Sequence, residues 1–387
     1  MHIEFNASER ASLGIEMELE VVDLATRELA SAAGDLLDAM GRGHPGGEHP
    51  KAKHELFEST VEIITGVCAN VAEARGDLEA TLAELTGHAG TRGLGLLCSG
   101  SHPFTHWATQ EVSPSARYRQ LVEEMQWLAR RLAIFGIHVH VGVRSAEKAI
   151  AIANGLCAYL PHLLAVSASS PYWMGQDTGL ASSRSKVFES LPMAGLPHQL
   201  ADWREFEEFM STLIRSKAIT SIREVWWDIR PHPDFGTVEM RVCDGVPRLS
   251  EVAAVAALTQ CLVESMDAGL DEGRVPVVPK AWILRENKWK ATRYGMEAEI
   301  IVDDQGNLRP LRELVAELVD ELAPVARRLG CTEELASVAT VIEEGPSYAR
   351  QRALVADGAS LADVVDALLA ELRTDLPVRS GDGGGRR

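Results

Sequence analysis

Three short segments of the chain each carry polar side chains two residues apart. The pairs are Glu16 with Glu18, His138 with His140, and Glu239 with Arg241. Residues i and i+2 of a β-strand lie on the same face, so three neighbouring strands would combine the pairs into one wall of carboxylates and imidazoles. Carboxylate oxygens with a minority of imidazole nitrogens suit Mg²⁺ or Mn²⁺, and Mg²⁺ commonly completes its coordination with substrate phosphates. The pattern favours metal-assisted phosphate chemistry.

Each pair taken alone also has a simpler interpretation. Alternating glutamates on one strand most often mark a solvated face, which applies to Glu16 and Glu18. Either His138 or His140 could be a core histidine whose hydrogen bonds are satisfied. The metal interpretation therefore depends on the repetition of the pattern over three strands.

Arginines in the same segments supply the complementary charge. Five of them lie in or beside polar motifs: Arg119, Arg184, Arg230, Arg241 and Arg293. A guanidinium fork binds carboxylate or phosphate through two parallel hydrogen bonds, although a surface ion pair is the alternative for any one of them. The chain has no GxxxxGK[ST] sequence, so a nucleotide would be held by a fold other than the P-loop.

Hydrophobic periodicity predicts the elements that must position these side chains. Residues 13–23 alternate between apolar and acidic and predict a strand with a carboxylate face. Further strands are expected within 54–67, near 94–98, at 137–143 and within 224–231 and 236–244. Helices are expected at 69–89, 116–135, 146–170 with a break at Pro161, and 249–270, and amphipathic helices follow Leu311 and Leu361. The long segment 170–197 contains arginine and aromatic residues and is expected to be a functional loop.

Composition narrows the class of protein. The 387 residues are 46% hydrophobic and 24% charged, which is the balance of a soluble globular protein with a sizeable core. A net charge of −18 argues against general nucleic-acid binding. Six cysteines without a CxxC pair predict reduced, buried thiols. The first residues do not resemble a signal peptide, and no uninterrupted apolar run reaches the ~20 residues of a membrane span, so a cytoplasmic protein without membrane contact is expected.

Five longer motifs occur in a fixed order along the chain. They are LGIEMELEVVD, HELFESTVEIITGV, FGIHVHVGV, ASSPYWMGQDTGLASSRS and WWDIRPHPDFGTVEMRVCD. Over roughly residues 11–300 the chain resembles the type 2 glutamate–cysteine ligases, also called carboxylate–amine ligases. The resemblance implies an α+β, glutamine-synthetase-like fold, in which a curved, mainly antiparallel sheet forms a funnel flanked by helices. Residues 1–375 would form a single catalytic domain with a helical part at 308–375, followed by a Gly-rich disordered tail at 376–387.

The same resemblance implies roles for individual side chains. Metal ligands would be Glu16, Glu18, Glu62, His138 and Glu239, with Glu55 as a further candidate. Arg241 would act in catalysis beside Glu239 by meeting the ATP γ-phosphate and the acyl phosphate. Arg184, Asn287 and Arg293 would line the ATP site, and Tyr118, Arg119 and His140 the substrate site, with Arg119 as a carboxylate clamp. Many members have a third carboxylate where this chain has Met17, but that position points to the opposite face of the strand.

The implied reaction joins a carboxylate to an amine. The γ-carboxylate of glutamate would attack the ATP γ-phosphate to give γ-glutamyl phosphate, and an amine would then displace phosphate, with two or three Mg²⁺ (or Mn²⁺) ions present. No residue marks cysteine as the acceptor, so another carboxylate or amine stays an alternative, and a homodimer is suggested only by the resemblance. Two other classes stay open. A metallohydrolase would use the same face to activate water, although the chain has no HExxH, and a non-catalytic protein would bind nucleotide or metal without turnover.

Overall fold

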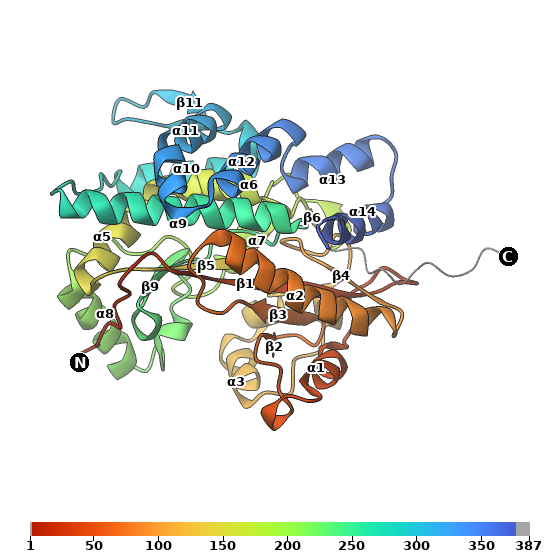
Figure 1. Cartoon of the computed structure of the whole chain (residues 1–387). Helices are drawn as coiled ribbons and strands as arrows, with labels where there is room; N and C mark the ends of the chain where they lie inside the picture. Colours follow the sequence, from red (N-terminus) through yellow and green to blue (C-terminus); the bar gives the residue numbers. More distant parts are fainter. Residues whose placement is uncertain (1, 377–387) are drawn as a thin grey trace.

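The computed structural model describes residues 2–376 of the chain (Figure 1). The predicted disordered tail, apart from its first residue Leu376, lies outside the described residues. An antiparallel sheet with helices around it forms the body of the molecule, as the α+β prediction requires.

The main sheet has seven strands in the order β2-β3-β1-β5-β9-β8, with β4 pairing separately with β1. Their bounds are β1 Leu13–Asp23, β2 Ala52–His54, β3 Thr60–Ile64, β4 Leu94–Leu97, β5 Ile137–Gly142, β8 Ile229–His232 and β9 Thr237–Met240. All of these pairings are antiparallel. Two small hairpins lie apart from the sheet, one of β6 Tyr172–Trp173 with β7 Gln176–Asp177, the other of β10 Glu299–Ile301 with β11 Leu308–Pro310.

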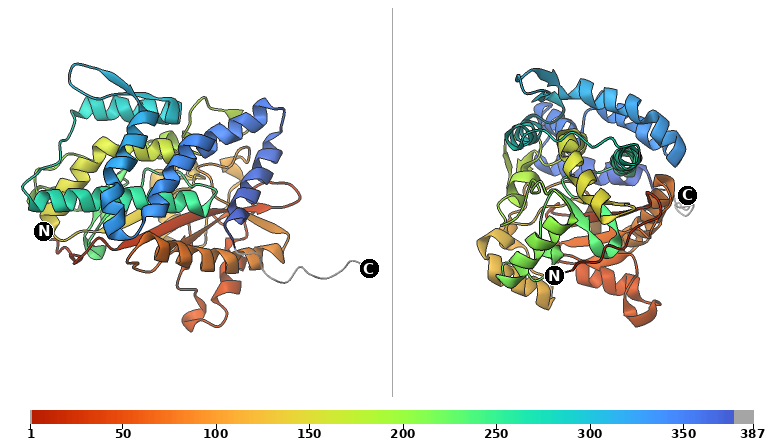
Figure 2. Two further views of the ribbon diagram at one scale, coloured as in Figure 1. Left: turned by 45° about the horizontal axis from the view of Figure 1, so that its top comes forward. Right: turned by 90° about the vertical axis from the view of Figure 1, so that its left-hand side faces the viewer.

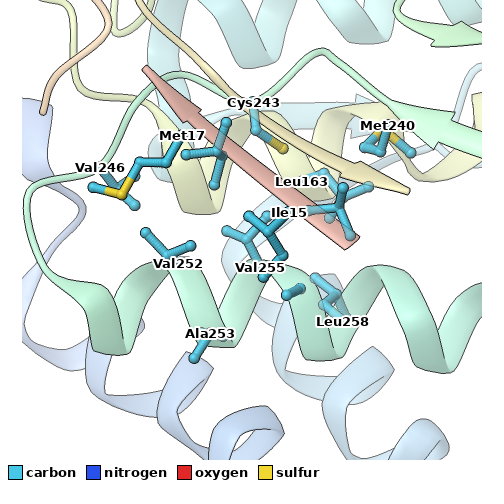
Figure 3. Packing of buried hydrophobic residues seen from close by; sticks show 14 of the residues in the cluster. Ile15, Met17, Leu163, Met240, Cys243, Val246, Val252, Ala253, Val255 and Leu258 are labelled. Carbon is cyan, nitrogen blue, oxygen red and sulfur yellow. The ribbon is translucent and has the colours of Figure 1, made fainter. Parts of the chain in front are cut away.

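One face of the sheet packs on long apolar helices. Figure 3 shows Ile15 and Met17 of β1 beside Val252 and Val255 of α9 (Leu249–Asp271) and Leu163 of α6 (Leu160–Ser167). Met17 is fully buried there, so it lies on the face opposite to Glu16 and Glu18, as a strand with period two requires. The lack of a carboxylate at position 17 therefore leaves the polar face unchanged.

Two helical segments, residues 146–167 and α9, are long and apolar enough to cross a membrane by length and composition. In each case 78% of the apolar window is buried inside the protein. Both are therefore explained as core helices.

The C-terminal helices form a layer on the side of the sheet that α9 covers, and α3 (Ala116–Met125) lies on the other side (Figures 1 and 2). The layer contains α10 Ala281–Tyr294, α11 Leu311–Leu329, α12 Thr332–Glu344, α13 Ser347–Ala356 and α14 Leu361–Thr374. The two predicted amphipathic helices correspond to α11 and α14. The remaining helices are α1 Ala33–Gly41, α2 Val71–Gly90, α4 Trp127–Arg130, α5 Ala146–Leu156, α7 Ser183–Phe188 and α8 Trp203–Arg215.

Two predicted helices differ from the structure. The helix expected at 116–135 stops at Met125, because Gln126 takes a left-handed φ of +49° before the short α4, and the chain then leaves the helix to enter β5. The break expected at Pro161 lies earlier, at the 3₁₀ turn Cys157–Tyr159. Pro161 occupies the first turn of α6, where a missing N–H removes no helical hydrogen bond. All six cysteines are free and buried, as predicted.

Candidate active site

The polar face of the sheet forms the floor of a cavity of about 370 Å³. Ten of the predicted site residues line it: Glu16, Glu18, Glu55, Glu62, Tyr118, His138, His140, Arg184, Glu239 and Arg241. They come from β1, β3, β5 and β9, from the position that follows β9, from the loop after β2, and from α3 and α7. Residues far apart in the sequence therefore meet in one site.

Strand register explains how the pairs meet. Glu16 on β1 lies opposite His138 on β5, and His140 lies opposite Glu239 on β9. On the other side of β1, Glu18 lies opposite Glu62 of β3. The prediction that three polar strands are neighbours in one sheet is confirmed, and β3 adds a fourth.

Glu16, His138 and Glu239 form the first of two groups that could hold a cation. One possible ligand atom from each lies within 4.8 Å of the others. Nδ1 of His138 is 2.9 Å from Oε2 of Glu16, and Nε2 of His140 is 3.3 Å from Oε1 of Glu16. Burial would raise the pKa of Glu16, but the hydrogen bonds from His138 and His140 hold the pKa well below its ordinary value. Glu16 is therefore ionised.

Glu18, Glu55 and Glu62 form the second group. Burial and the charge of Glu55 raise the pKa of Glu18 to about 7, and burial and the neighbouring carboxylates raise the pKa of Glu62 well above its ordinary value. The pKa of Glu55 is also raised, chiefly by burial. Within residues 2–376 no Lys, Arg or His side chain forms an ion pair with these three carboxylates, and Glu18 accepts one hydrogen bond from the Gly136 N–H at 2.5 Å. Such uncompensated negative charge fits a divalent cation with oxygen ligands.

Unlike the carboxylates of the second group, Glu239 forms ion pairs with two arginines. Its side chain is 1% exposed, Oε2 lies 2.8 Å from Nε of Arg230, and Oε1 pairs with Arg241. Burial would raise the pKa of Glu239, but Arg230 and Arg241 lower it far below the ordinary range. Nε of Arg241 and Nε of Arg184 are buried and have no hydrogen-bond partner in the described part of the chain. Donors in this state fit an anionic ligand such as a phosphoryl group.

The segment 170–197, predicted as a loop, contains the β6–β7 hairpin and α7, and α7 places Arg184 in the cavity. The carboxylate of Asp244 accepts hydrogen bonds from the hydroxyls of Ser170 and Ser182 at 2.7 and 2.8 Å, and this anchors the segment. Arg184 then donates to the backbone oxygens of Val242 and Arg241 at 3.2 and 3.3 Å. A Cβ at Gly136 would overlap the Arg184 guanidinium, so any other residue at that position would displace the guanidinium.

Three predicted residues do not line the cavity. Arg119 is exposed on α3, and Asn287 binds both backbone groups of Ile301 at 2.8 Å, which makes it a brace between α10 and β10. Arg293 donates to the Gly179 carbonyl. Arg117, which the sequence analysis missed, lines the cavity in place of Arg119. Residues two apart on a helix differ by about 200° in direction, so the phase of α3 decides between the two arginines.

Arg223 and Trp226 also line the cavity and were not identified from the sequence. They precede β8, around the 3₁₀ turn Ile222–Glu224. Trp226 belongs to the EVWWDIRP motif. The one sequence feature that could have identified these two cavity residues is their position just before a strand with a polar face.

A family model described as "Glutamate-cysteine ligase family 2 (GCS2)" matches residues 12–367. The chain belongs to glutamate–cysteine ligase family 2. Relatives in this family include a protein of Frankia casuarinae named "Putative glutamate–cysteine ligase 2-1", 56% identical over 98% of this chain and 100% of the relative. A Thermobifida fusca protein with the corresponding name is 52% identical over 99% of this chain and 96% of its own length. Family membership makes the chain an enzyme of the carbon–nitrogen ligase class.

Solved ligase structures share the fold of this family member. A Francisella tularensis glutamate–cysteine ligase, solved in complex with AMP, superposes with a TM-score of 0.68 at 16% identity, covering 96% of this chain and 91% of its own. A bifunctional glutathione synthetase from Pasteurella multocida gives a TM-score of 0.64 at 13% identity over 94% of this chain and 53% of its own. The predicted glutamine-synthetase-like ligase fold is confirmed, and its sheet is open rather than closed into a barrel.

Proposed function

We propose that this enzyme uses ATP to join the γ-carboxylate of glutamate to the amino group of cysteine, through γ-glutamyl phosphate. One observation carries the proposal: one cavity is lined both by Glu18, Glu55 and Glu62, which form no ion pair, and by Arg184 and Arg241, whose buried Nε atoms have no hydrogen-bond partner among residues 2–376. Such a cavity suits a polyphosphate with divalent cations, because it offers oxygen ligands for the cations and forked donors for the phosphates. The family and the names of its relatives support the choice of glutamate and cysteine.

The two carboxylate groups of the cavity would hold Mg²⁺ or Mn²⁺. Glu18, Glu55 and Glu62 would bind on one side, and Glu16, His138 and Glu239 on the other. Bound Mg²⁺ would neutralise the negative charges of the phosphates. The chain's own residues keep these ligands ready, since Glu16 is already ionised and Arg230 fixes the orientation of Glu239.

Phosphoryl transfer would take place between the metal-binding wall and the arginines. The γ-carboxylate oxygen bonds to the γ-phosphorus as the bond to the ADP oxygen breaks, and Arg241 and Arg184 donate to the transferring group. The acceptor nitrogen then bonds to the acyl carbon, phosphate leaves, and the nitrogen loses a proton. Most of the catalysis would come from positioning and electrostatics.

Phosphate release tests the proposal. Wild-type enzyme is supplied with ATP, Mg²⁺ and glutamate, and cysteine or another amine is added one at a time, with Glu239→Gln as the matched variant. Release that requires glutamate and cysteine together, and falls sharply in the variant, supports the assignment. Release with a different carboxylate or amine would keep the ligase class and reject cysteine or glutamate. Turnover without ATP would indicate a hydrolase, and ATP binding without phosphate release would indicate a binding protein.

Assembly into a homodimer and location in the cytoplasm stay predictions.

A further inference from the structure

A second, smaller cavity of about 210 Å³ adjoins the first. It lies between α3 and the segment 220–226, and it shares Arg117, Leu121, Arg223 and Trp226 with the first cavity. It has none of the metal-binding carboxylates, and neither Arg184 nor Arg241 lines it. The side cavity is therefore a separate compartment that opens beside the reaction site.

Two arginines without acidic partners stand where the compartments join. Arg117 and Arg223 are exposed side chains, and among the described residues neither forms an ion pair. The Arg117 guanidinium lies 5.6 Å from the centroid of the Tyr118 ring, and its charge acts to lower the pKa of Glu55 in the first cavity, which burial raises. Two guanidinium groups that line a cavity and have no ion-pair partner among the described residues favour an anionic ligand.

The two carboxylates that line the side cavity accept hydrogen bonds from residues close to them in the sequence. Glu124 accepts a hydrogen bond from Nε2 of Gln120 at 2.8 Å. Glu224 accepts one from the Thr220 N–H at 3.0 Å and another from the Thr220 hydroxyl. Both carboxylates therefore accept hydrogen bonds from their own segments, and in the described part of the chain neither forms an ion pair with Arg117 or Arg223.

We propose that Arg117 and Arg223 bind the α-carboxylate of the acceptor, an inference that rests on the proposed function. The acceptor is then an α-amino acid and not a simple amine. Leu121, Met125 and Trp226 supply an apolar wall for a small side chain such as a thiol. The volume is below the ~300–1,000 Å³ of sites for drug-sized ligands, which agrees with a small amino acid. Because glutamate and ATP must reach the carboxylate wall of the first cavity, we assign the side cavity to the acceptor amino acid.

Cysteine and cysteamine, which is cysteine without its carboxylate, test this inference in wild type and in Arg117→Ala, Arg223→Ala and Arg119→Ala. Loss of a hydrogen bond to a charged group predicts that the KM for cysteine rises about 10- to 100-fold in Arg117→Ala and Arg223→Ala. The KM values for cysteamine, ATP and glutamate should change little. Arg119, two residues away on the same helix, is the matched position, and the inference expects its variant to behave as wild type.

Three kinetic results would overturn the inference. The first is an unchanged preference for cysteine over cysteamine in both cavity variants. The second is a rise in the KM for glutamate instead of cysteine, which would assign the arginines to the donor. The third is the predicted loss in Arg119→Ala instead of Arg117→Ala.

Calorimetric binding separates this inference from the proposed function. If wild type releases no phosphate with glutamate and either thiol, the proposed function has failed, and titration with cysteine and cysteamine in the presence of Mg²⁺ and ADP decides the inference. Cysteine binding that is weakened in Arg223→Ala, with weaker binding of cysteamine to wild type, supports it. Equal binding of the two thiols, or binding of neither, overturns it.

Discussion

His138 and Glu16 lie directly opposite each other on β5 and β1, with Nδ1 of the imidazole 2.9 Å from Oε2 of the carboxylate. Burial and the charge of Arg241 lower the pKa of His138 to about 4, so the ring is neutral at pH 7. Because Glu16 is ionised, it accepts the hydrogen bond and Nδ1 is the donor. Nε2 then keeps its lone pair for a cation, the arrangement by which a carboxylate orients a metal-binding histidine.

This relationship predicts different results for two substitutions of His138. In His138→Asn the amide can replace Nδ1 as a donor to Glu16 but cannot reach the position of Nε2. We expect the stability of the metal-free protein to stay close to wild type while Mg²⁺ or Mn²⁺ affinity falls about 10-fold or more. In His138→Gln the amide extends further toward Nε2, so more of the affinity should remain. Calorimetric titration with Mn²⁺ measures the metal affinity of both variants. Equal affinity of His138→Asn and wild type would contradict the assignment of Nε2 of His138 as a metal ligand.

Glu62→Gln should affect stability and activity in opposite directions. Burial and the charges of Glu55, Glu16 and Glu18 disfavour the ionised form of Glu62, so a neutral amide relieves repulsion in the metal-free protein. We expect a higher Tm in EDTA, a smaller rise in Tm on adding Mg²⁺, and loss of most ATP-dependent phosphate release. Thermal unfolding with and without Mg²⁺ checks this, and a lower Tm in EDTA would contradict the repulsion among these carboxylates.

Arg241→Lys keeps the charge but removes the forked donor. Arg241 pairs with Glu239 and has a free Nε directed to no other described residue. Loss of one donor to a transferring group typically lowers kcat about 10²- to 10³-fold. Steady-state kinetics should therefore show a fall in kcat with a smaller change in the KM for ATP. If kcat stays at the wild-type value while only the KM changes, Arg241 acts in ground-state binding alone.

Lys288→Met should destabilise the enzyme strongly. Nζ of Lys288 lies 2.5 Å from both Asp228 and Glu189, and the Lys288 and Asp228 side chains are only 3% and 4% exposed. Removing the cation leaves a buried carboxylate without a partner, which costs about 3–5 kcal/mol of unfolding free energy. The double variant Asp228→Asn/Lys288→Met should recover part of the loss. Urea unfolding at pH 7 measures each change, and a double variant no more stable than Lys288→Met would reject this explanation.

Asp228 also connects this ion pair to the cavity. Its backbone oxygen accepts a hydrogen bond from the Arg241 N–H at 2.8 Å. Lys288→Met should therefore lower phosphate release even at temperatures where the variant stays folded, whereas the exposed control Arg204→Ala should not.

His102 predicts a loss of stability in acid. The buried ring contacts the Arg27 oxygen through Nε2 and accepts backbone N–H groups from Phe104 and Thr105 at Nδ1. Burial lowers the pKa of His102 from its ordinary 6.5 to about 3. Below pH 6.5 the unfolded chain binds the proton and the folded chain does not, so the stabilisation is complete above pH 6.5 and is lost as the pH falls. By pH 5 the loss is about 2 kcal/mol.

His102→Asn keeps an acceptor for the two N–H groups and removes the titrating ring. Between pH 7 and pH 5 its unfolding free energy should fall by about 2 kcal/mol less than that of wild type. The other buried histidines titrate in both proteins and cancel in the comparison. Urea unfolding at the two pH values provides the test, and equal losses in the two proteins would exclude His102 as the cause.

Local geometry allowed the sequence to determine which side chains share a face. The period of two in residues 13–23 and 137–142 places Glu16 with Glu18 and His138 with His140, and it turns Met17 toward the core, whatever the rest of the chain does. Six of the seven strands of the main sheet and the long helices α2 and α9 follow from the same local patterns, whereas β2 and the two small hairpins were not predicted.

Tertiary packing decided which of these side chains meet in the cavity. The placement of Glu16 opposite His138 and of Glu18 opposite Glu62 depends on strand order and register, which pair residues 122 and 44 positions apart and which no local pattern encodes. The rotation of α3 puts Arg117 and not Arg119 in the cavity, and packing of α10 against β10 makes Asn287 a brace. These outcomes depend on how whole elements bury their apolar faces, and that is set by contacts between distant segments.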